Sequence, residues 1–196
     1  MDFFILTTLL ITIILVSVWY FVLSSTVKDF IRKLLIKIYV ATYSSKKKGN
    51  HFEKHVADRF TKEYYRIIRW QGDKVSSSGM YAEESSDPDM IVKFKLREYE
   101  TQFAVECKWR SKLKGDKVQI DKPYKIDNYR AFGKKEGLPV YLAIGVGGLP
   151  SKPDQFYLLP LVELSFNSMS RKRLEKFRGG VKTKFFYDRE KKILKA

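Results

Sequence analysis

The chain has 196 residues and a formal net charge of +16 at pH 7, from 38 lysines and arginines against 22 acidic residues. That length fits one well-cored domain with an appendage and is short for two full domains. The basic excess indicates a polyanionic partner, which is nucleic acid, an anionic membrane surface, or both. The single cysteine, Cys107, excludes an internal disulfide framework and a structural zinc site built on several thiolates.

The first segment, residues 3–23, has no charged side chain. About 20 consecutive apolar residues match the hydrocarbon thickness of a bilayer, and Trp19 and Tyr20 fit an interfacial aromatic belt. A cleaved signal peptide needs a positively charged start and a shorter apolar region, whereas the charged residue before this segment is Asp2. We therefore predict an uncleaved transmembrane anchor over residues 1–24, which contacts the lipid bilayer through residues 3–23.

The next segment is strongly basic. Between residues 24 and 50 one acidic residue is set against seven basic ones, which are Lys28, Arg32, Lys33, Lys37, Lys46, Lys47 and Lys48. The positive-inside rule then predicts a single-pass membrane protein whose C-terminal domain is cytoplasmic. Residues 26–43 have a helical pattern that continues the membrane helix, lies on the anionic leaflet, or packs on the soluble domain. Residues 44–50 are typical of a polar linker, so we expect a basic amphipathic helix and linker over 25–49 and a folded domain over 50–196.

This domain mixes helix and strand patterns. An apolar stripe with a spacing of about four residues predicts one helix that carries Phe52, Val56, Phe60, Tyr64 and Ile67. Two short β-type runs, 90–96 and 103–109, predict a hairpin. The remaining predicted elements are a helix around 126–132, a buried central strand in 139–148, a strand in 156–164, a helix in 170–177 and a strand in 183–195. This order predicts a mixed α/β sheet covered by helices.

The second run of the hairpin reads Phe-Ala-Val-Glu-Cys-Lys-Trp. Residues two apart in a strand face the same side, so Glu106 and Lys108 share one face and the apolar residues around them share the other. If the hairpin turns around residues 97–100, Asp89 lies opposite residue 108, within a position or two of Glu106. The simpler alternative is a solvated strand face with a cross-strand salt bridge. Asp87, just before Asp89, is expected to be a capping or turn residue.

Two carboxylates brought together repel each other unless a cation neutralises them. Oxygen ligands suit a hard divalent ion such as Mg²⁺, which keeps several waters and readily takes a phosphate oxygen. A neighbouring lysine can orient or activate the attacking water and stabilise charge that develops on the phosphate. Asp89, Glu106 and Lys108 together therefore indicate metal-dependent phosphodiester hydrolysis.

The signature of the PD-(D/E)xK nucleases resembles two short segments of this chain in the same order, Pro88-Asp89 and then Glu106-Cys107-Lys108. The first helix of that family resembles residues 49–60, with Glu53 at its glutamate position. The resemblance covers residues 49 to about 148. It implies a restriction endonuclease-like mixed sheet flanked by helices, here preceded by one transmembrane helix.

The resemblance also implies roles for these residues. Asp89 and Glu106 would bind Mg²⁺ or Mn²⁺ together with the main-chain carbonyl of Cys107, Lys108 would be the catalytic lysine, and Glu53 would assist. Relatives of the restriction endonuclease and Holliday junction resolvase types often carry a glutamine in the next helix. In this chain Gln119 precedes Pro123 and is expected in a loop, and Lys125 or Tyr129 takes the helical positions.

Basic residues follow the glutamate–lysine strand directly and are expected to contact the nucleic-acid backbone: Arg110, Lys112, Lys114, Lys117 and Lys125. Trp109 is either a stacking platform for a base or part of the core. The predicted function is that of a membrane-anchored, metal-dependent endonuclease, with DNA as the substrate that the resemblance implies. The alternatives are a catalytically inactive, membrane-tethered nucleic-acid-binding module and an anionic-lipid-binding scaffold. The sequence leaves the oligomeric state open, a dimer included.

Overall fold

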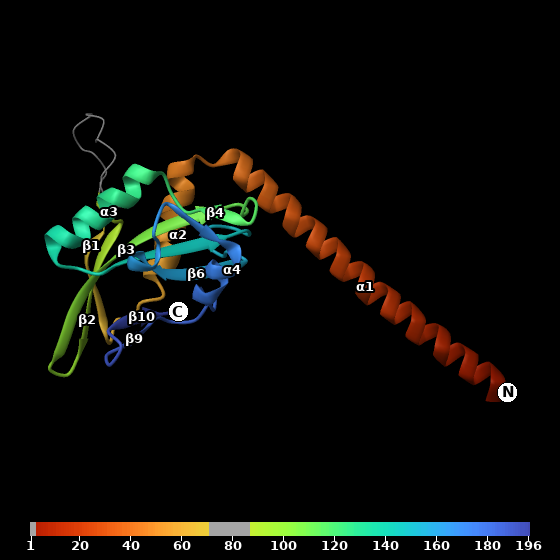
Figure 1. Cartoon of the computed structure of the whole chain (residues 1–196). Helices are drawn as coiled ribbons and strands as arrows, with labels where there is room; N and C mark the ends of the chain where they lie inside the picture. The colour runs from red at the N-terminus through yellow and green to blue at the C-terminus, as the bar shows by residue number, and fades with distance from the viewer. Residues whose placement is uncertain (1–2, 71–86) are drawn as a thin grey trace. The chain divides into compact units, whose positions relative to one another are not determined.

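A computed structural model of the chain describes residues 3–70 and 87–196 (Figure 1). The chain forms two compact units, Met1–Tyr43 and Ser44–Ala196. The first unit is a single helix, α1 (Phe3–Thr42). Residues 26–42 therefore continue the helix of the apolar segment. At the junction, the hydroxyls of Ser25 and Thr26 donate to the carbonyl of Val22 at 2.7 and 2.9 Å, so these polar side chains are satisfied within the helix.

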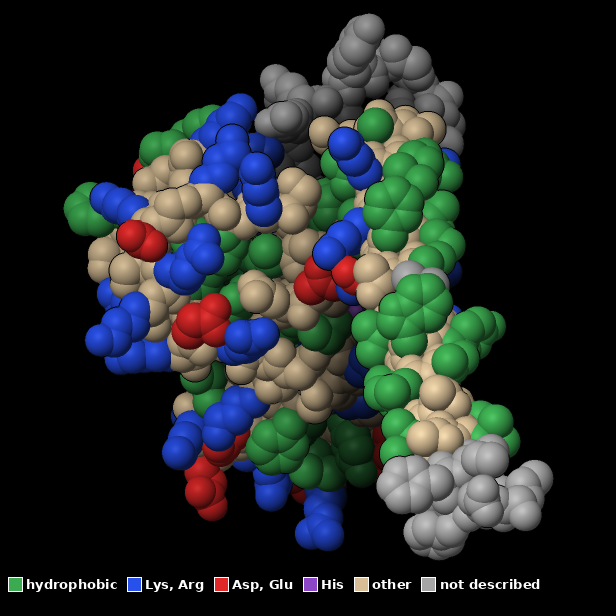
Figure 2. Space-filling view, turned by 90° about the vertical axis from the view of Figure 1, so that its right-hand side faces the viewer, with side chains coloured by type: hydrophobic (Ala, Val, Ile, Leu, Met, Phe, Trp, Pro, Cys, Tyr) green, Lys and Arg blue, Asp and Glu red, His purple; other side chains and the backbone are tan. Residues whose placement is uncertain are grey.

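Helix α1 is apolar along most of its surface, as Figure 2 shows for one face. Leu15, Trp19 and Phe30 are 62%, 68% and 66% exposed. Within the described residues, the stretch Thr8–Thr42 is long and apolar enough to cross a membrane, and none of it is buried. A signal sequence near an N-terminus meets the same criteria of helix length and hydropathy. The predicted anchor over residues 1–24 therefore stays a prediction, and its residues 1 and 2 lie outside the described part of the chain.

The predicted linker over residues 44–50 is wrong, because helix α2 (Ser45–Ala57) begins there. The Ser44 hydroxyl caps the helix by accepting the Lys47 amide at 3.3 Å, and lysine is itself a good helix former. The folded unit accordingly begins at Ser44 and not at residue 50.

The predicted apolar helix stripe is also too long. Helix α2 ends at Ala57, and Tyr64 and Ile67 lie beyond it, Ile67 within strand β1 (Tyr65–Trp70). Phe60 still reaches the core across the turn between the two elements. The segment Tyr65–Trp70 is rich in aromatic and β-branched residues, which favour a strand over a helix.

The sheet has six strands in the order β1-β2-β3-β5-β6-β8, with β3 and β5 parallel and the other neighbours antiparallel. The further elements in chain order are β2 (Met90–Leu96), β3 (Tyr99–Arg110), β4 (Lys117–Gln119), α3 (Pro123–Glu136), β5 (Val140–Val146), β6 (Gln155–Pro160), η2 (Leu161–Glu163), β7 (Ser168–Ser170), α4 (Arg171–Leu174), η3 (Glu175–Phe177), β8 (Arg178–Gly179), β9 (Phe186–Asp188) and β10 (Ile193–Lys195). The predicted mixed α/β sheet, the β2–β3 hairpin, the α3 helix and the buried central strand β5 are confirmed.

Both faces of the sheet are covered. Helix α2 and the β9–β10 pair supply core residues on one face, with Val105 and Cys107 from β3. Helix α3 and the β4–β7 pair supply core residues on the other face, where Ala104 lies. Gly145 in β5 lets α2 approach closely, because a Cβ atom there would lie 2.3 Å from the ring of Phe52. Helix α2 therefore packs closely against this face of the sheet.

Candidate active site

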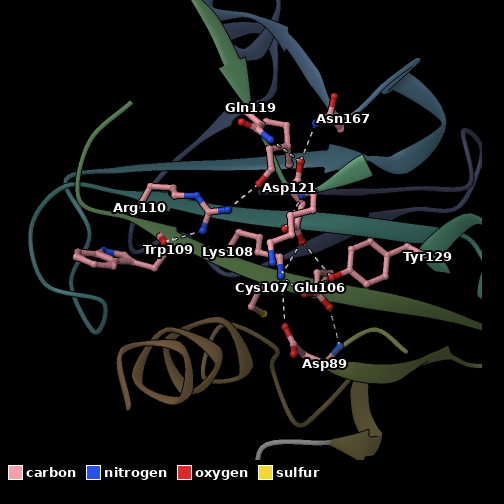
Figure 3. Close-up of polar contacts among 12 residues, drawn as sticks. Asp89, Glu106, Cys107, Lys108, Trp109, Arg110, Gln119, Asp121, Tyr129 and Asn167 are labelled. Atoms are coloured by element: carbon pink, nitrogen blue, oxygen red, sulfur yellow. Dashed lines mark hydrogen bonds and ion pairs between the residues drawn. The ribbon is translucent and has the colours of Figure 1, made fainter. Parts of the chain in front are cut away.

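The β2–β3 hairpin sets two acidic residues side by side. Its register pairs Met90 with Val105, so the preceding residue, Asp89, lies opposite Glu106. The amide of Asp89 donates to Glu106 Oε2 at 3.2 Å, and the amide of Cys107 donates to Asp89 Oδ2 at 2.7 Å (Figure 3). The prediction that Asp89 lies opposite residue 108 is wrong by two positions, because the turn needs only Arg97 and Glu98, with Arg97 at a φ of 56°.

Glu106 is buried, with 4% of its surface exposed. Its Oε1 atom accepts the Tyr129 hydroxyl at 2.7 Å and lies 2.5 Å from Lys108 Nζ. Tyr129 comes from α3, which covers this face of the sheet. The alternative of a solvated strand face is therefore wrong: Glu106 and Lys108 do form a salt bridge, but they form it beneath a helix.

Lys108 has a second acidic partner that the sequence did not reveal. Its Nζ atom lies 2.9 Å from Asp121 Oδ2, and the same oxygen accepts the Tyr129 hydroxyl at 3.2 Å. The main-chain carbonyl of Asp121 accepts the side-chain amide of Asn167 at 3.0 Å, which fixes the short segment between β4 and α3. One signal could have identified Asp121. It stands two residues before Pro123, the first residue of α3, and so immediately before a helix that packs on the sheet.

Glu53 reaches the same region from α2. It is 9% exposed, and its Oε2 atom accepts the indole N–H of Trp70 at 3.0 Å. Burial raises the pKa of Glu53, and the negative charge of Glu106 raises it further, although the Trp70 hydrogen bond acts in the opposite direction. Helix α2 thus adds a third carboxyl group to the electrostatic environment of the hairpin pair.

The charges of the site shift one another's pKa values. Removal from water, and then the negative charges of Glu106 and Glu53, raise the pKa of Asp89 well above its usual range. Burial disfavours the Lys108 ammonium, yet its ion pairs with Glu106 and Asp121 outweigh burial and raise the pKa of Lys108. Lys108 therefore stays cationic, and in turn it lowers the pKa of Asp121 against the effect of burial.

The donor set at this position fits a hard divalent cation. Asp89 Oδ1 makes no hydrogen bond within the described residues, and a divalent ion would relieve the repulsion that raises the Asp89 pKa. The described residues contain no group of three or more His, Cys, Asp or Glu side chains arranged to hold an ion. Two carboxylates suit Mg²⁺, which is commonly bound through one or two carboxylates and keeps its waters.

Other predicted residues lie outside this cluster. Asp87 forms an ion pair with Arg69 at 3.3 Å. Gln119 was expected in a loop, but it ends strand β4, and its amide donates to the carbonyl of Asp121 at 3.4 Å. Trp109 packs against the core and donates to the carbonyl of Gly147 at 3.1 Å.

The basic residues predicted to bind nucleic acid divide into two groups. Arg110, Lys112, Lys114 and Lys117 line one cleft just past the end of β3. Lys125 lies apart from them, in the first turn of α3.

No protein-family model matches the sequence, and no curated protein matches it. Among solved structures, the chain is similar to Hjc of Archaeoglobus fulgidus, a Holliday junction resolvase from an archaeal hyperthermophile. The sequence identity is 15%, and the match covers 68% of this chain and 97% of that chain at a TM-score of 0.46. The identity and the TM-score are both too low to assign a function to this chain.

Proposed function

We propose that this chain is a membrane-anchored, divalent-metal-dependent nuclease with a restriction endonuclease-like domain, which cleaves DNA internally. One observation carries the proposal: the β2–β3 hairpin and α3 bury Glu106 and place it in contact with both Asp89 and Lys108. A carboxylate pair with a fixed cation suits hydrolysis of a phosphodiester, whereas a surface that only binds phosphate gains nothing from two carboxylates. The resemblance to PD-(D/E)xK nucleases supports DNA as the substrate.

Each residue has a role that follows from its surroundings. Asp89 and Glu106, with the carbonyl of Cys107, would hold Mg²⁺ or Mn²⁺, which when bound supplies a Lewis acid for the phosphate. Ion pairs with Glu106 and Asp121 favour the cationic form of Lys108 by raising its pKa, and a cation here stabilises negative charge on the phosphate and orients or activates the attacking water. Glu53 assists as the neighbouring carboxyl group on α2.

The membrane part of the proposal is supported by α1 and by the charge distribution. A helix of 40 residues is about 60 Å long, which is about twice the hydrocarbon thickness of a bilayer. Its basic residues all follow the apolar stretch, which is the arrangement of a cytoplasmic C-terminal domain. Such a tether would confine cleavage to nucleic acid near the membrane. Unchanged biological activity after deletion of residues 1–24 would contradict this role.

The first experiment incubates the full-length chain in detergent with supercoiled plasmid, single-stranded DNA or RNA, in Mg²⁺, Mn²⁺ or EDTA. The variants are Glu106→Ala and Lys108→Ala, and the matched control is Lys93→Ala, because Lys93 pairs with Glu100 on the same hairpin outside the site. We expect cleavage in the presence of metal, loss of cleavage in both site variants, and full cleavage by the control.

A second candidate function is a catalytically inactive, membrane-tethered module that only binds nucleic acid. The observation in its favour is that both oxygens of Glu106 already accept hydrogen bonds from protein groups. Salt-sensitive binding of DNA without cleavage in any metal would select this module over the nuclease.

A further inference from the structure

A basic cleft lies just past the end of β3. It has a volume of about 420 Å³, and its charged lining residues are Arg110, Lys112, Lys114 and Lys117. Asp116 is the single acidic residue between positions 110 and 119, and it does not line the cleft. The charged side chains that line this cleft are therefore all positive.

The walls of the cleft are held by the fold. Strand β4 pairs with β7, which brings Lys117 opposite Ser170. The next residue, Arg171, donates three hydrogen bonds to this segment. Its main-chain amide donates to the carbonyl of Asp116 at 2.7 Å. Its guanidinium donates to the carbonyls of Leu113 and Gly115 at 3.4 and 3.1 Å. The segment that carries Lys112 and Lys114 is thus fixed at several points along its backbone.

These cations differ from some of the other cations on the surface, which are paired. Arg173 pairs with Glu163, and Lys195 pairs with Asp188. Within the described residues, none of the four cations of the cleft forms an ion pair with a carboxylate. Arg110 interacts at longer range with Asp121, but positive charges held together repel one another, and a bound anion relieves that repulsion.

The cleft adjoins the candidate active site. Arg110 is two residues beyond Lys108 on β3, so both side chains leave the same face of the strand about 7 Å apart. The Arg110 guanidinium donates to the carbonyl of Ile120 at 2.8 Å, and the next residue, Asp121, holds Lys108 (Figure 3). An extended polyanion that occupies the site can therefore continue directly into the cleft.

We propose that this cleft is a second phosphate-binding site, which takes a backbone phosphate of nucleic acid next to the phosphate that reacts. The inference rests on the proposed function for its substrate, but binding at the cleft needs neither metal nor cleavage. The cleft would bind the substrate equally well in the ground state and in the transition state. Removing its charges should therefore raise the KM of cleavage and leave kcat unchanged.

The test measures DNA affinity against salt concentration, in EDTA, for the full-length chain in phosphatidylcholine nanodiscs. The cleft variant is Lys112→Gln, Lys114→Gln and Lys117→Gln combined. The control variant combines Lys134→Gln, Lys135→Gln and Lys191→Gln, three exposed lysines elsewhere on the folded unit. Each phosphate contact contributes about 0.9 to the slope of log affinity against log salt, so a cleft variant that no longer holds its one phosphate should lose about 0.9 from that slope. The control should keep the slope of the wild type.

Equal slopes for the cleft variant and the control would overturn the proposal. A lipid headgroup is the other source of a phosphate. To test it, the protein is reconstituted into phosphatidylcholine liposomes, and the binding of these liposomes to separate vesicles that contain 30% phosphatidylserine is measured. If the cleft variant loses that binding and keeps its DNA slope, the cleft binds lipid and the proposal is also overturned. Because binding is measured in EDTA, failure of the proposed nuclease would appear as missing cleavage with an unchanged result at the cleft.

Discussion

The middle of β3 and the segment just past its end both carry charged residues, but those in the strand are largely buried and paired, whereas those past its end are exposed and unpaired in the part of the chain that the structure describes. Glu106 and Lys108 are 5% and 16% exposed at their side chains, and each has partners of opposite charge or hydrogen-bonding partners. Lys112, Lys114 and Lys117 are exposed and form no ion pair within the described residues. Burial fixes a charge in one position, where it can act on a reacting group, whereas exposure leaves a charge available to a partner. The comparison predicts that buried charges determine stability and chemistry, and exposed charges determine affinity.

The largest effect is expected from Lys108→Met. The change leaves Glu106 and Asp121 buried without their shared cation, and removal of one partner of a buried pair costs about 3–5 kcal/mol. Urea unfolding of the full chain in detergent, followed by tryptophan fluorescence, measures this loss. A loss below about 1 kcal/mol would mean that water reaches the pair, and the contrast between the two regions would fail.

A smaller effect is expected from divalent metal. Mg²⁺ at about 100 times its dissociation constant should stabilise the fold by about 2.7 kcal/mol, because it binds the folded chain and not the unfolded one. Asp89→Asn should abolish this gain. Asp127→Asn, on the exposed face of α3, is the control and should keep it. Equal stabilisation of both variants would place the ion elsewhere in the chain.

Tyr129→Phe should cost about 1–2 kcal/mol, because Glu106 loses a buried hydrogen bond from the hydroxyl that also lies 3.2 Å from Asp121 Oδ2. Thermal unfolding compares this variant with Tyr124→Phe, whose side chain is half exposed on the same helix. If the two variants unfold alike, the Tyr129 hydroxyl does not support the site.

The smallest effect is expected from Lys112→Met. An exposed lysine without an ion pair should change the free energy of unfolding by less than about 0.5 kcal/mol. The same urea measurement, made beside Lys108→Met, gives the direct contrast between the two regions. A loss of several kcal/mol at Lys112 would show that the cleft is part of the folded core and is not a surface for an anion.

Local sequence patterns predicted the parts of the site that lie on one hairpin. Alternation along 103–109 predicted the shared face of Glu106 and Lys108, and the two short runs predicted the hairpin that brings Asp89 to them. Tyr129 was one of two residues expected at the helical position of the site, and its hydroxyl contacts Glu106. Asp121 was missed, because its contact with Lys108 depends on how the chain leads into α3.

The other errors have the same origin. The apolar spacing of Phe60 and Tyr64 continues that of α2, and only the tertiary structure shows that the helix has already ended at Ala57. The lysine run before α2 is polar, which is typical of a linker, but Ser44 caps it as a helix. A periodic pattern identifies an element better than it identifies the residue where the element ends.

The two-residue turn of the β2–β3 hairpin also affects the order in which the chain folds. Contacts between residues close in sequence form before distant ones, so Asp89 and Glu106 should meet while the chain that contains Asp121 and Tyr129 is still being synthesised or is still unfolded. At that stage the two carboxylates repel each other, with only Lys108 to offset them. Divalent cations, which offset this repulsion, should therefore accelerate the refolding of the chain.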